Sequence, residues 1–273
     1  MDLNAVTAVL RPRGREELPQ ERAGDAWLGG GTWLFSEPQP ALRRLIDLSS
    51  LGWNPLRADA QGLCIAATCT IVNLYSFEPP AHWRAASLIA ECCRSFLASF
   101  KIWSMATVGG NVCLALPAGP MISLCAALDG ECVVWTPEGG ERREKVIDFV
   151  RGPRETTLAP GEVLRAIQLP AAALLRRAAF RRASLTPLGR SGVLLIGTLD
   201  EEGFALTVTA STRHPVRLDF PALPGRQALA ERLAGAIPED LYYDDVHGAP
   251  DWRRHMTGLL AEEIREELAE ADA

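Results

Sequence analysis

Apolar residues recur with two different periods along this chain, and the two periods predict a mixture of helices and strands. Residues 85–100 predict the clearest amphipathic helix, because apolar side chains recur three or four positions apart at Leu88, Ile89, Cys92, Cys93, Phe96 and Leu97. Residues 62–77 carry β-branched side chains first and helical spacing afterwards, which predicts a strand and then a helix. Residues 121–150 predict a helix and then two strands joined by a hairpin turn at the sequence PEGG.

Glycine and proline divide the rest of the pattern. Residues 26–34 predict a short strand, a glycine turn and the start of a helix, whereas residues 106–120 predict a loop. Beyond residue 170, the stretches 178–185, 192–200 and 204–211 predict antiparallel strands joined by turns, and the C-terminal region predicts helices. We therefore expect an α/β part to about residue 170 and a smaller part of strands followed by helices.

Composition and charge narrow the class of protein. The 273 residues are 48% apolar, so the chain can bury a core without disulfides or a structural metal. The formal net charge of −6 argues against non-specific binding to nucleic acid, which needs a basic surface. No signal-peptide pattern opens the chain, and its apolar runs are far shorter than the roughly 18 residues of a membrane span. We expect a cytoplasmic protein without a membrane span.

Residues typical of metal binding and of acid–base catalysis do not form recognisable motifs. The seven cysteines contain no C-x-x-C pair, and the single C-x4-C spacing of Cys64 and Cys69 lacks the second pair that an iron–sulfur cluster needs. The histidines show no H-E-x-x-H spacing, and no nucleophile elbow is present. We therefore predict reduced thiols, no metal site and no catalytic side chain, a pattern that fits chemistry carried by a cofactor.

Two glycine clusters are the candidate binding residues. The first is Gly29-Gly30-Gly31-Thr32, and the second is Thr107-Val108-Gly109-Gly110-Asn111. Bare glycine backbone lets N–H groups approach a phosphate, helped by a hydroxyl or amide side chain nearby. A tight turn with positive φ is the simpler interpretation of the first cluster alone, and neither cluster matches the Rossmann or P-loop spacing. Together, two such loops fit one extended diphosphate held between two subdomains.

An ordered series of motifs surrounds the two clusters. LGGGTWL resembles A-G-G-T-x-L, LIDLSSL resembles L-[IV]-D-L-x-x-L, and LCIAATCTIVNL resembles I-G-A-x-x-T-x-x-x-L. ATVGGNVCLALPAGP resembles T-[IV]-G-G-N-[IL]-x-x-A-S-P-x-x-D, while RHPVRL and APDWRRHM resemble R-P-x-R-x and S-x-x-Y-R-R. In this order, and over nearly the whole chain, the motifs resemble the FAD-binding medium subunit of the molybdenum hydroxylases, the xanthine dehydrogenase and carbon monoxide dehydrogenase flavoproteins.

The resemblance implies an α+β fold of two domains. Residues 1–170 would form a FAD-binding domain of the PCMH type, similar to vanillyl-alcohol oxidase. Its two α/β subdomains, about residues 1–52 and 53–170, would hold FAD between them. Residues 171–273 would form a domain similar to the C-terminal domain of the carbon monoxide dehydrogenase flavoprotein, an α+β unit with a three-stranded antiparallel sheet.

The resemblance also implies which residues bind FAD. The family's diphosphate-binding positions correspond to the two clusters and the neighbours of the first: Leu28, Gly29, Gly30, Gly31, Thr32, Trp33, Leu34, Thr107, Val108, Gly109, Gly110 and Asn111. Leu164 corresponds to a family leucine beside the adenine or the flavin. Arg181 corresponds to the lysine of a family F-K-x-A-S motif and keeps its positive charge.

Three departures from the family pattern concern the cofactor. The family's S-P-x-x-D becomes Leu116-Pro117-Ala118-Gly119-Pro120, so its serine and its cofactor-contacting aspartate are lost. Trp33 stands where a small polar or acidic residue is usual, and the aspartate usual after F-K-x-A-S is absent around Gly189 and Arg190. These departures indicate a divergent subfamily with a different FAD pose or weaker binding.

The activity implied by the resemblance is electron transfer inside a larger complex. The chain would take electrons from [2Fe-2S] clusters on a small partner subunit and pass them to NAD or another acceptor, while a large subunit carries molybdopterin. The expected assembly is a heterotrimer. Two alternatives stay open: a flavin-free scaffold subunit that kept the fold, and a stand-alone flavin oxidoreductase.

Overall fold

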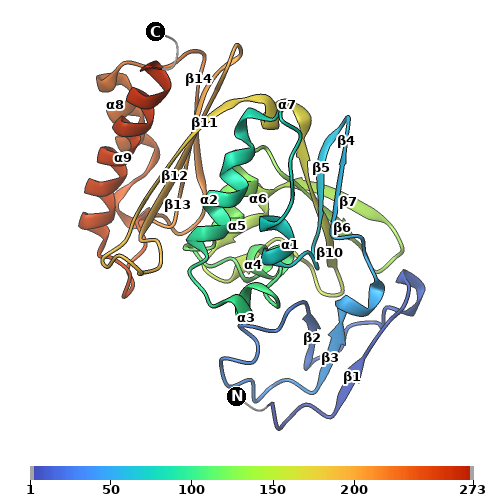
Figure 1. Cartoon of the computed structure of the whole chain (residues 1–273). Coiled ribbons are helices and arrows are strands. Elements are labelled where there is room, and N and C mark those ends of the chain that lie inside the picture. The colour runs from blue at the N-terminus through green and yellow to red at the C-terminus, as the bar shows by residue number, and fades with distance from the viewer. Residues whose placement is uncertain (1–2, 271–273) are drawn as a thin grey trace.

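The first strands of the chain form a small parallel sheet in the computed structural model, which describes residues 3–270. β1 (Ala8–Leu10) and β2 (Asp25–Leu28) both pair in parallel with the central β3 (Arg44–Asp47). The first glycine cluster follows β2 directly, at the carboxyl edge of this sheet, where open parallel sheets usually bind ligands. This part lies at the lower right of Figure 1, in blue.

A five-stranded antiparallel sheet forms the middle of the molecule. Its strands, in spatial order, are β4 (Leu56–Asp59), β5 (Gly62–Ala66), β10 (Val163–Pro170), β6 (Glu131–Trp135) and β7 (Glu141–Lys145). Six helices belong to this part: α1 (Ile71–Tyr75), α2 (Ser87–Ser95), α3 (Phe100–Trp103), α4 (Val108–Leu114), α5 (Pro120–Ala127) and α6 (Val146–Phe149). A two-stranded hairpin, β8 (Val150–Gly152) with β9 (Glu155–Thr156), precedes β10.

The C-terminal sheet has four strands, where the family resemblance implied three. β11 (Arg177–Ala183), β12 (Val193–Asp200) and β13 (Gly203–Thr209) match the three predicted strands closely. The fourth strand, β14 (Val216–Phe220), pairs with the free edge of β13. Two helices complete this part, α8 (Arg226–Ala236) and α9 (Pro250–Glu270), whereas α7 (Ala171–Leu175) packs against β5 and β10 of the middle sheet.

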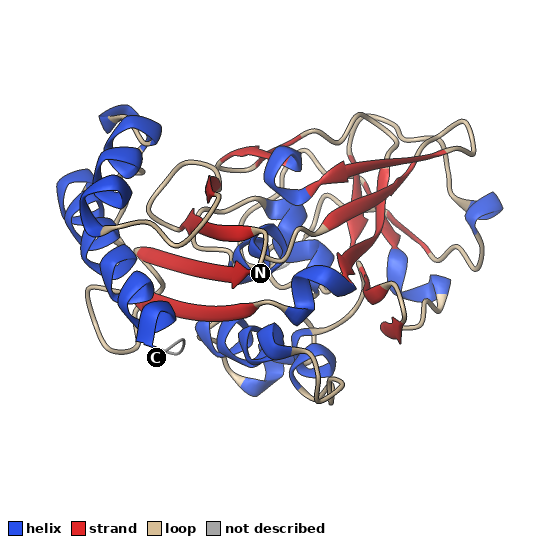
Figure 2. Ribbon diagram, turned by 90° about the horizontal axis from the view of Figure 1, so that it is seen from above, coloured by secondary structure: helices blue, strands red, loops and turns tan. Residues whose placement is uncertain are grey.

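The C-terminal sheet is covered on both faces. Leu194 and Ile196 of β12 lie in the same hydrophobic cluster as the buried helix α5. Leu195 on the opposite face packs with residues of α8 and α9, the two helices seen along the left side of the molecule in Figure 2. Because both faces are buried, β12 is apolar along almost its whole length, VLLIGTL, instead of alternating.

Local predictions were confirmed where the hydrophobic period was strong. The helix predicted over residues 85–100 appears as α2, although it ends at Ser95, and the predicted β6–β7 hairpin is present. The predicted loop at residues 106–120 was wrong, because Val108–Leu114 is the helix α4. The helix predicted after the first glycine cluster was also wrong, since a hydrogen-bonded turn stands there, with the Phe35 amide donating to the Gly31 carbonyl at 2.9 Å.

Tertiary contact explains why a glycine-rich segment is helical in α4. Glycine has a low intrinsic helix propensity. At Gly109, however, an added Cβ would lie 2.5 Å from the Cβ of Ala67, so only glycine lets the helix sit this close to the end of β5. The Thr107 hydroxyl caps the helix. Within residues 3–270, none of the helices combines the length and the apolar character that a membrane crossing requires.

Candidate functional site

The structure brings the two glycine clusters into direct contact. A Cβ added at Gly30 would lie 1.6 Å from the Met105 carbonyl oxygen, and one added at Gly29 would lie 2.9 Å from Thr107 Oγ1. Gly30 meets a backbone atom and therefore requires glycine, whereas Gly29 meets only the threonine side chain, in line with the alanine that the family motif has there. The first cluster therefore rests on the residues that lead into α4.

Gly31 has the backbone conformation that the turn interpretation predicts. Its φ is +69°, and an added Cβ would lie 2.5 Å from Phe35 Cε2. Such a left-handed residue is most easily a glycine. The first cluster thus combines a turn at Gly31 with a close backbone approach at Gly30, and the two interpretations left open by the sequence are compatible.

The turn leaves a row of hydrogen-bond donors open. Among residues 3–270, no acceptor is found for the backbone amides of residues 30–34 or for the Thr32 hydroxyl. Unpaired backbone N–H groups that point from a turn are a common way of binding anions. Residues 30–34 are also partly shielded from solvent, since all five are half-buried.

The second cluster differs, because the amides of residues 108–111 already donate within the chain. An α-helix normally leaves its first amides without partners. In α4 the three such amides after the N-cap residue have one: Val108 donates to Cys69 O (2.8 Å), Gly109 to Ala67 O (2.9 Å) and Gly110 to Thr107 Oγ1 (3.0 Å). Asn111 then makes the first regular bond of the helix, to Thr107 O (3.0 Å). The second cluster is therefore a closed platform beneath the first.

Asn111 joins α4 to the start of α5. Its Oδ1 accepts a hydrogen bond from the Met121 amide at 3.1 Å, so it satisfies an open amide of that helix. Pro120 precedes this amide as the first residue of α5, and it has no N–H of its own. The position of the family's lost aspartate is thus a buried, apolar helix start, without a carboxylate.

The structure places Leu164 on β10, which packs against α4, and Arg181 on the C-terminal sheet. Leu164 is buried in β10 among the core residues of the middle part. Arg181 lies on β11 and forms ion pairs with Glu263 (2.8 Å) and Glu267 (2.6 Å) of α9. Its guanidinium therefore has partners on the C-terminal helix, and its predicted contact with the cofactor stays a prediction.

Sequence reasoning missed one residue beside the first cluster. The guanidinium of Arg154 lies over the ring of Trp33, 4.7 Å from its centroid. Arg154 stands at the tip of the β8–β9 hairpin with a φ of +65°, and its amide donates to the Ala115 carbonyl at 3.1 Å. The sequence around Arg154 did not indicate this contact, because it joins segments that only the tertiary structure brings together.

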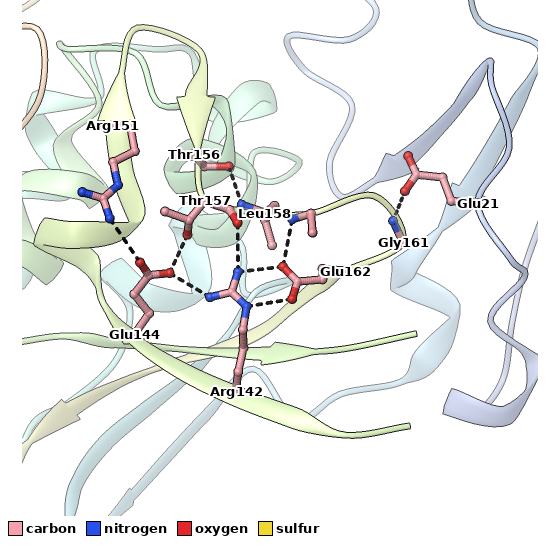
Figure 3. A network of polar contacts seen from close by, with 10 residues as sticks. Glu21, Arg142, Glu144, Arg151, Thr156, Thr157, Leu158, Gly161 and Glu162 are labelled. Carbon is pink, nitrogen blue, oxygen red and sulfur yellow. Dashed lines mark hydrogen bonds and ion pairs between the residues drawn. The ribbon is translucent and has the colours of Figure 1, made fainter. Parts of the chain in front are cut away.

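A network of charged groups fixes the base of that hairpin (Figure 3). Arg142 of β7 binds both carboxylate oxygens of Glu162, at 2.7 and 2.6 Å, and also reaches the Thr157 carbonyl at 3.1 Å. Glu144 accepts from Arg142 at 2.7 Å and from the Thr157 hydroxyl at 2.5 Å. The hydrogen bonds from Arg142 hold the pKa of Glu162 below its ordinary value.

Other features of the molecule do not form a competing site. A cavity of about 750 Å³ lies between the segment Arg15–Glu21 and the β6–β7 turn, and it is lined by no residue of either cluster. Burial raises the pKa of Cys69 and Cys93 to about 12, which keeps these thiols protonated. In the described part of the chain, no three acidic, histidine or cysteine side chains gather in a way that could hold a metal ion.

A comparison with protein families decides the assignment. Residues 17–172 match the family described as the FAD binding domain in molybdopterin dehydrogenase. The chain belongs to this family. The resemblance inferred from the motifs is confirmed, and so is FAD as the family's cofactor.

Solved structures confirm the fold over the whole chain. Quinoline 2-oxidoreductase from Pseudomonas putida 86 superposes with a TM-score of 0.80 at 19% identity, covering 99% of each chain. Reconstituted CO dehydrogenase from Oligotropha carboxidovorans gives a TM-score of 0.81 at 22% identity, covering 97% of this chain and 98% of the other. A comparison with curated protein sequences gave no match.

The residues present fit the diphosphate of FAD at the first cluster. The open amides of residues 30–34 and the Thr32 hydroxyl are donors suited to phosphate oxygens, and Gly30 and Gly31 leave no side chain in the way. The second cluster contacts the first and supports it, but the amides of residues 108–111 already donate within the chain and are not open to a phosphate.

Proposed function

We propose that the chain is the FAD-binding, electron-transfer subunit of a molybdenum-containing hydroxylase or dehydrogenase. The observation that carries the proposal is the row of open amides at residues 30–34, held against Met105 and Thr107 in a chain of the FAD-binding family. FAD supplies the chemistry when bound, since it accepts single electrons and can deliver a hydride. The protein's own residues bind the diphosphate and fix its position.

The proposal also includes two partner subunits. A small subunit would carry [2Fe-2S] clusters, and a large subunit would carry molybdopterin and the substrate site, in a cytoplasmic heterotrimer of the xanthine dehydrogenase type. The acceptor would be NAD or another oxidant. The solved structures with this fold support the proposal, because they include a quinoline 2-oxidoreductase and a carbon monoxide dehydrogenase.

The proposed division of labour within the chain has a boundary near residue 170. Residues 1–170 would bind FAD, as subdomains of about 1–52 and 53–170, and residues 171–273 would form the C-terminal domain. The family match, which ends at residue 172, supports this boundary. The shared core supports tight docking, because Leu194 and Ile196 pack with the helices of the middle part.

A flavin-free scaffold subunit is the second candidate, favoured by one observation. The family's cofactor-contacting aspartate corresponds to Pro120, which is buried at the start of α5. A chain that had lost FAD would tolerate this change more easily than one that still binds it.

Analysis of the complex purified from its native host tests both candidates. We expect about one FAD for each copy of this chain, and bleaching of the flavin absorbance when the complex is mixed with its reductant under anaerobic conditions. A complex that contains both partner subunits, iron and molybdenum but no flavin would overturn the electron-transfer proposal and support the scaffold. Turnover by the isolated chain would instead support a stand-alone flavin oxidoreductase.

A further inference from the structure

The tip of the β8–β9 hairpin is held in an uncommon conformation, and its arginine contacts the ring of Trp33, next to the first cluster. Arg154 has a φ of +65°, a region that L-residues other than glycine rarely adopt. The hydrogen bond from its amide to Ala115, which itself has a φ of +51°, ties the tip to the end of α4. Held in this way, the side chain of Arg154 reaches Trp33.

The base of the same hairpin is fixed independently. The Thr157 amide donates to Phe149 O at 3.0 Å, and the Arg142–Glu144–Glu162 network holds the Thr157 side chain and carbonyl (Figure 3). The hairpin is therefore restrained at its tip and at its base, so Arg154 has a defined position.

Arg154 carries a charge that no acidic group of the described chain neutralises. Arg151, three positions earlier on the same hairpin, lies 3.7 Å from Glu144. Arg154 forms no ion pair with any described carboxylate, and its contact is with the face of Trp33. A cation over an indole at an exposed site gains only about 0.5–1 kcal/mol, so this contact orients the guanidinium without satisfying its charge.

The loop below it supplies complementary donors. Trp33 belongs to the segment 30–34, whose amides have no acceptor in residues 3–270. Through the Trp33 ring, the guanidinium of Arg154 is therefore joined to the segment that carries the open amides. Arginine binds phosphate oxygens with two parallel hydrogen bonds, which a diphosphate accepts well.

We propose that Arg154 is the cationic residue that binds the dinucleotide's diphosphate, with Trp33 positioning its guanidinium above the first glycine cluster. This inference rests on the proposed function, since it names a contact of the same site. It also gives Trp33 a role: the large aromatic ring that replaces a small polar or acidic residue is the support on which Arg154 rests.

Variants of Arg154 test the proposal in the full chain. We expect Arg154→Gln to weaken the binding of FAD and of ADP by about 10- to 100-fold, the range for one charged hydrogen-bonding group. The binding of riboflavin, which has no phosphate, should not change. Arg154→Lys should recover part of the loss, and Trp33→Leu should cost FAD affinity less than Arg154→Gln does. The matched control is Arg151→Gln, on the same hairpin, which should bind FAD like the wild type.

Ionic strength separates a charge contact from a structural role. The wild-type affinity for FAD should fall as salt is added, and Arg154→Gln should show a smaller salt dependence, because one screened interaction is gone. Equal affinity and equal salt dependence in Arg154→Gln and wild type would overturn the inference while leaving FAD binding intact. Tighter binding in Arg154→Gln would also overturn it, since Arg154 would then block the loop. A wild-type chain that binds no FAD would overturn the proposed function itself.

Discussion

The two glycine clusters have similar sequences and opposite hydrogen-bonding states. The amides of residues 108–111 all donate to acceptors within the chain, whereas the amides of residues 30–34 have no acceptor among residues 3–270. The glycines differ accordingly, because Gly109 is needed for packing against Ala67 and Gly31 for a left-handed turn. Similar glycine motifs can thus have their amides paired within the chain in one place and open in another.

Position in the fold explains the difference. The second cluster starts a helix that lies against the end of β5, so strand-like contacts with residues 67–69 take up its donors. The first cluster leaves the edge of a small parallel sheet and rests on Met105, with no strand beside it. The comparison therefore assigns stability mainly to one cluster and binding mainly to the other.

The largest expected effect is on stability, at the second cluster. Gly109→Ala would bring a Cβ to 2.6 Å from the Ala67 carbonyl oxygen, so we expect a loss of about 3 kcal/mol in the free energy of unfolding. Chemical denaturation monitored by circular dichroism measures it. The control is Gly235→Ala in α8, where nothing lies within 4 Å of the added Cβ; it should be neutral or stabilising. Equal stability of Gly109→Ala and wild type would contradict the claim that this glycine is needed for α4 to pack against Ala67.

The next effect is on binding, at the first cluster. Gly30→Ala would push the loop away from the Met105 carbonyl and misplace the open amides. We expect FAD affinity to fall about 10- to 100-fold, as for the loss of hydrogen bonds to a charged group, which fluorescence titration of the flavin measures. Gly110→Ala is the matched variant in the second cluster, where the added Cβ meets only Thr107 Oγ1. Similar FAD affinities for the two variants would contradict the comparison.

The two threonines sharpen the same contrast with smaller changes. Thr107→Val removes the cap of α4 and should cost about 1 kcal/mol of stability. Thr32→Val removes a hydroxyl that has no partner in the described chain, so the melting temperature should stay the same while FAD affinity falls modestly. Thermal melts with and without FAD measure both variants. The reverse pattern, with Thr32→Val unstable and Thr107→Val defective only in binding, would invert the assignment.

The smallest expected effect is on the pH dependence of stability. Hydrogen bonds from Arg142 lower the pKa of Glu162 from its ordinary value of 4.5. A lowered pKa in the folded state adds stability that is present above pH 4.5 and is lost as the pH falls through the folded-state value. Glu162→Gln should therefore be less stable than wild type at neutral pH, and the difference should shrink in acid. Glu138→Gln, at an exposed position, is the control. A stability difference between Glu162→Gln and wild type that stays the same at low pH would argue against a role for the Arg142–Glu162 ion pair.

Local periodicity and motif order were sufficient for much of the fold. The spacing of Leu88, Cys92 and Phe96 predicted α2, and the PEGG turn predicted the β6–β7 hairpin. The ordered motifs predicted the family and its cofactor, which the family match confirmed. These features depend on short-range pattern, which the sequence carries directly.

The remaining features depend on tertiary contact. The glycines of residues 106–120 disfavour a helix, and the Thr107 cap alone did not indicate one; α4 also depends on its contacts with Ala67 and Cys69. The contact between Trp33 and Arg154 joins segments far apart in the sequence. The amides of the two clusters could not be told apart from glycine spacing, since their state depends on which segment lies beside each.

Amide hydrogen exchange of the full chain, with and without FAD, tests the central claim most directly. Without FAD, residues 108–111 should exchange slowly and residues 30–34 quickly, because only the former have acceptors. Added FAD should slow exchange at residues 30–34 and change residues 108–111 little. Rapid exchange at 108–111 without FAD, or new protection there and none at 30–34 when FAD binds, would contradict the account.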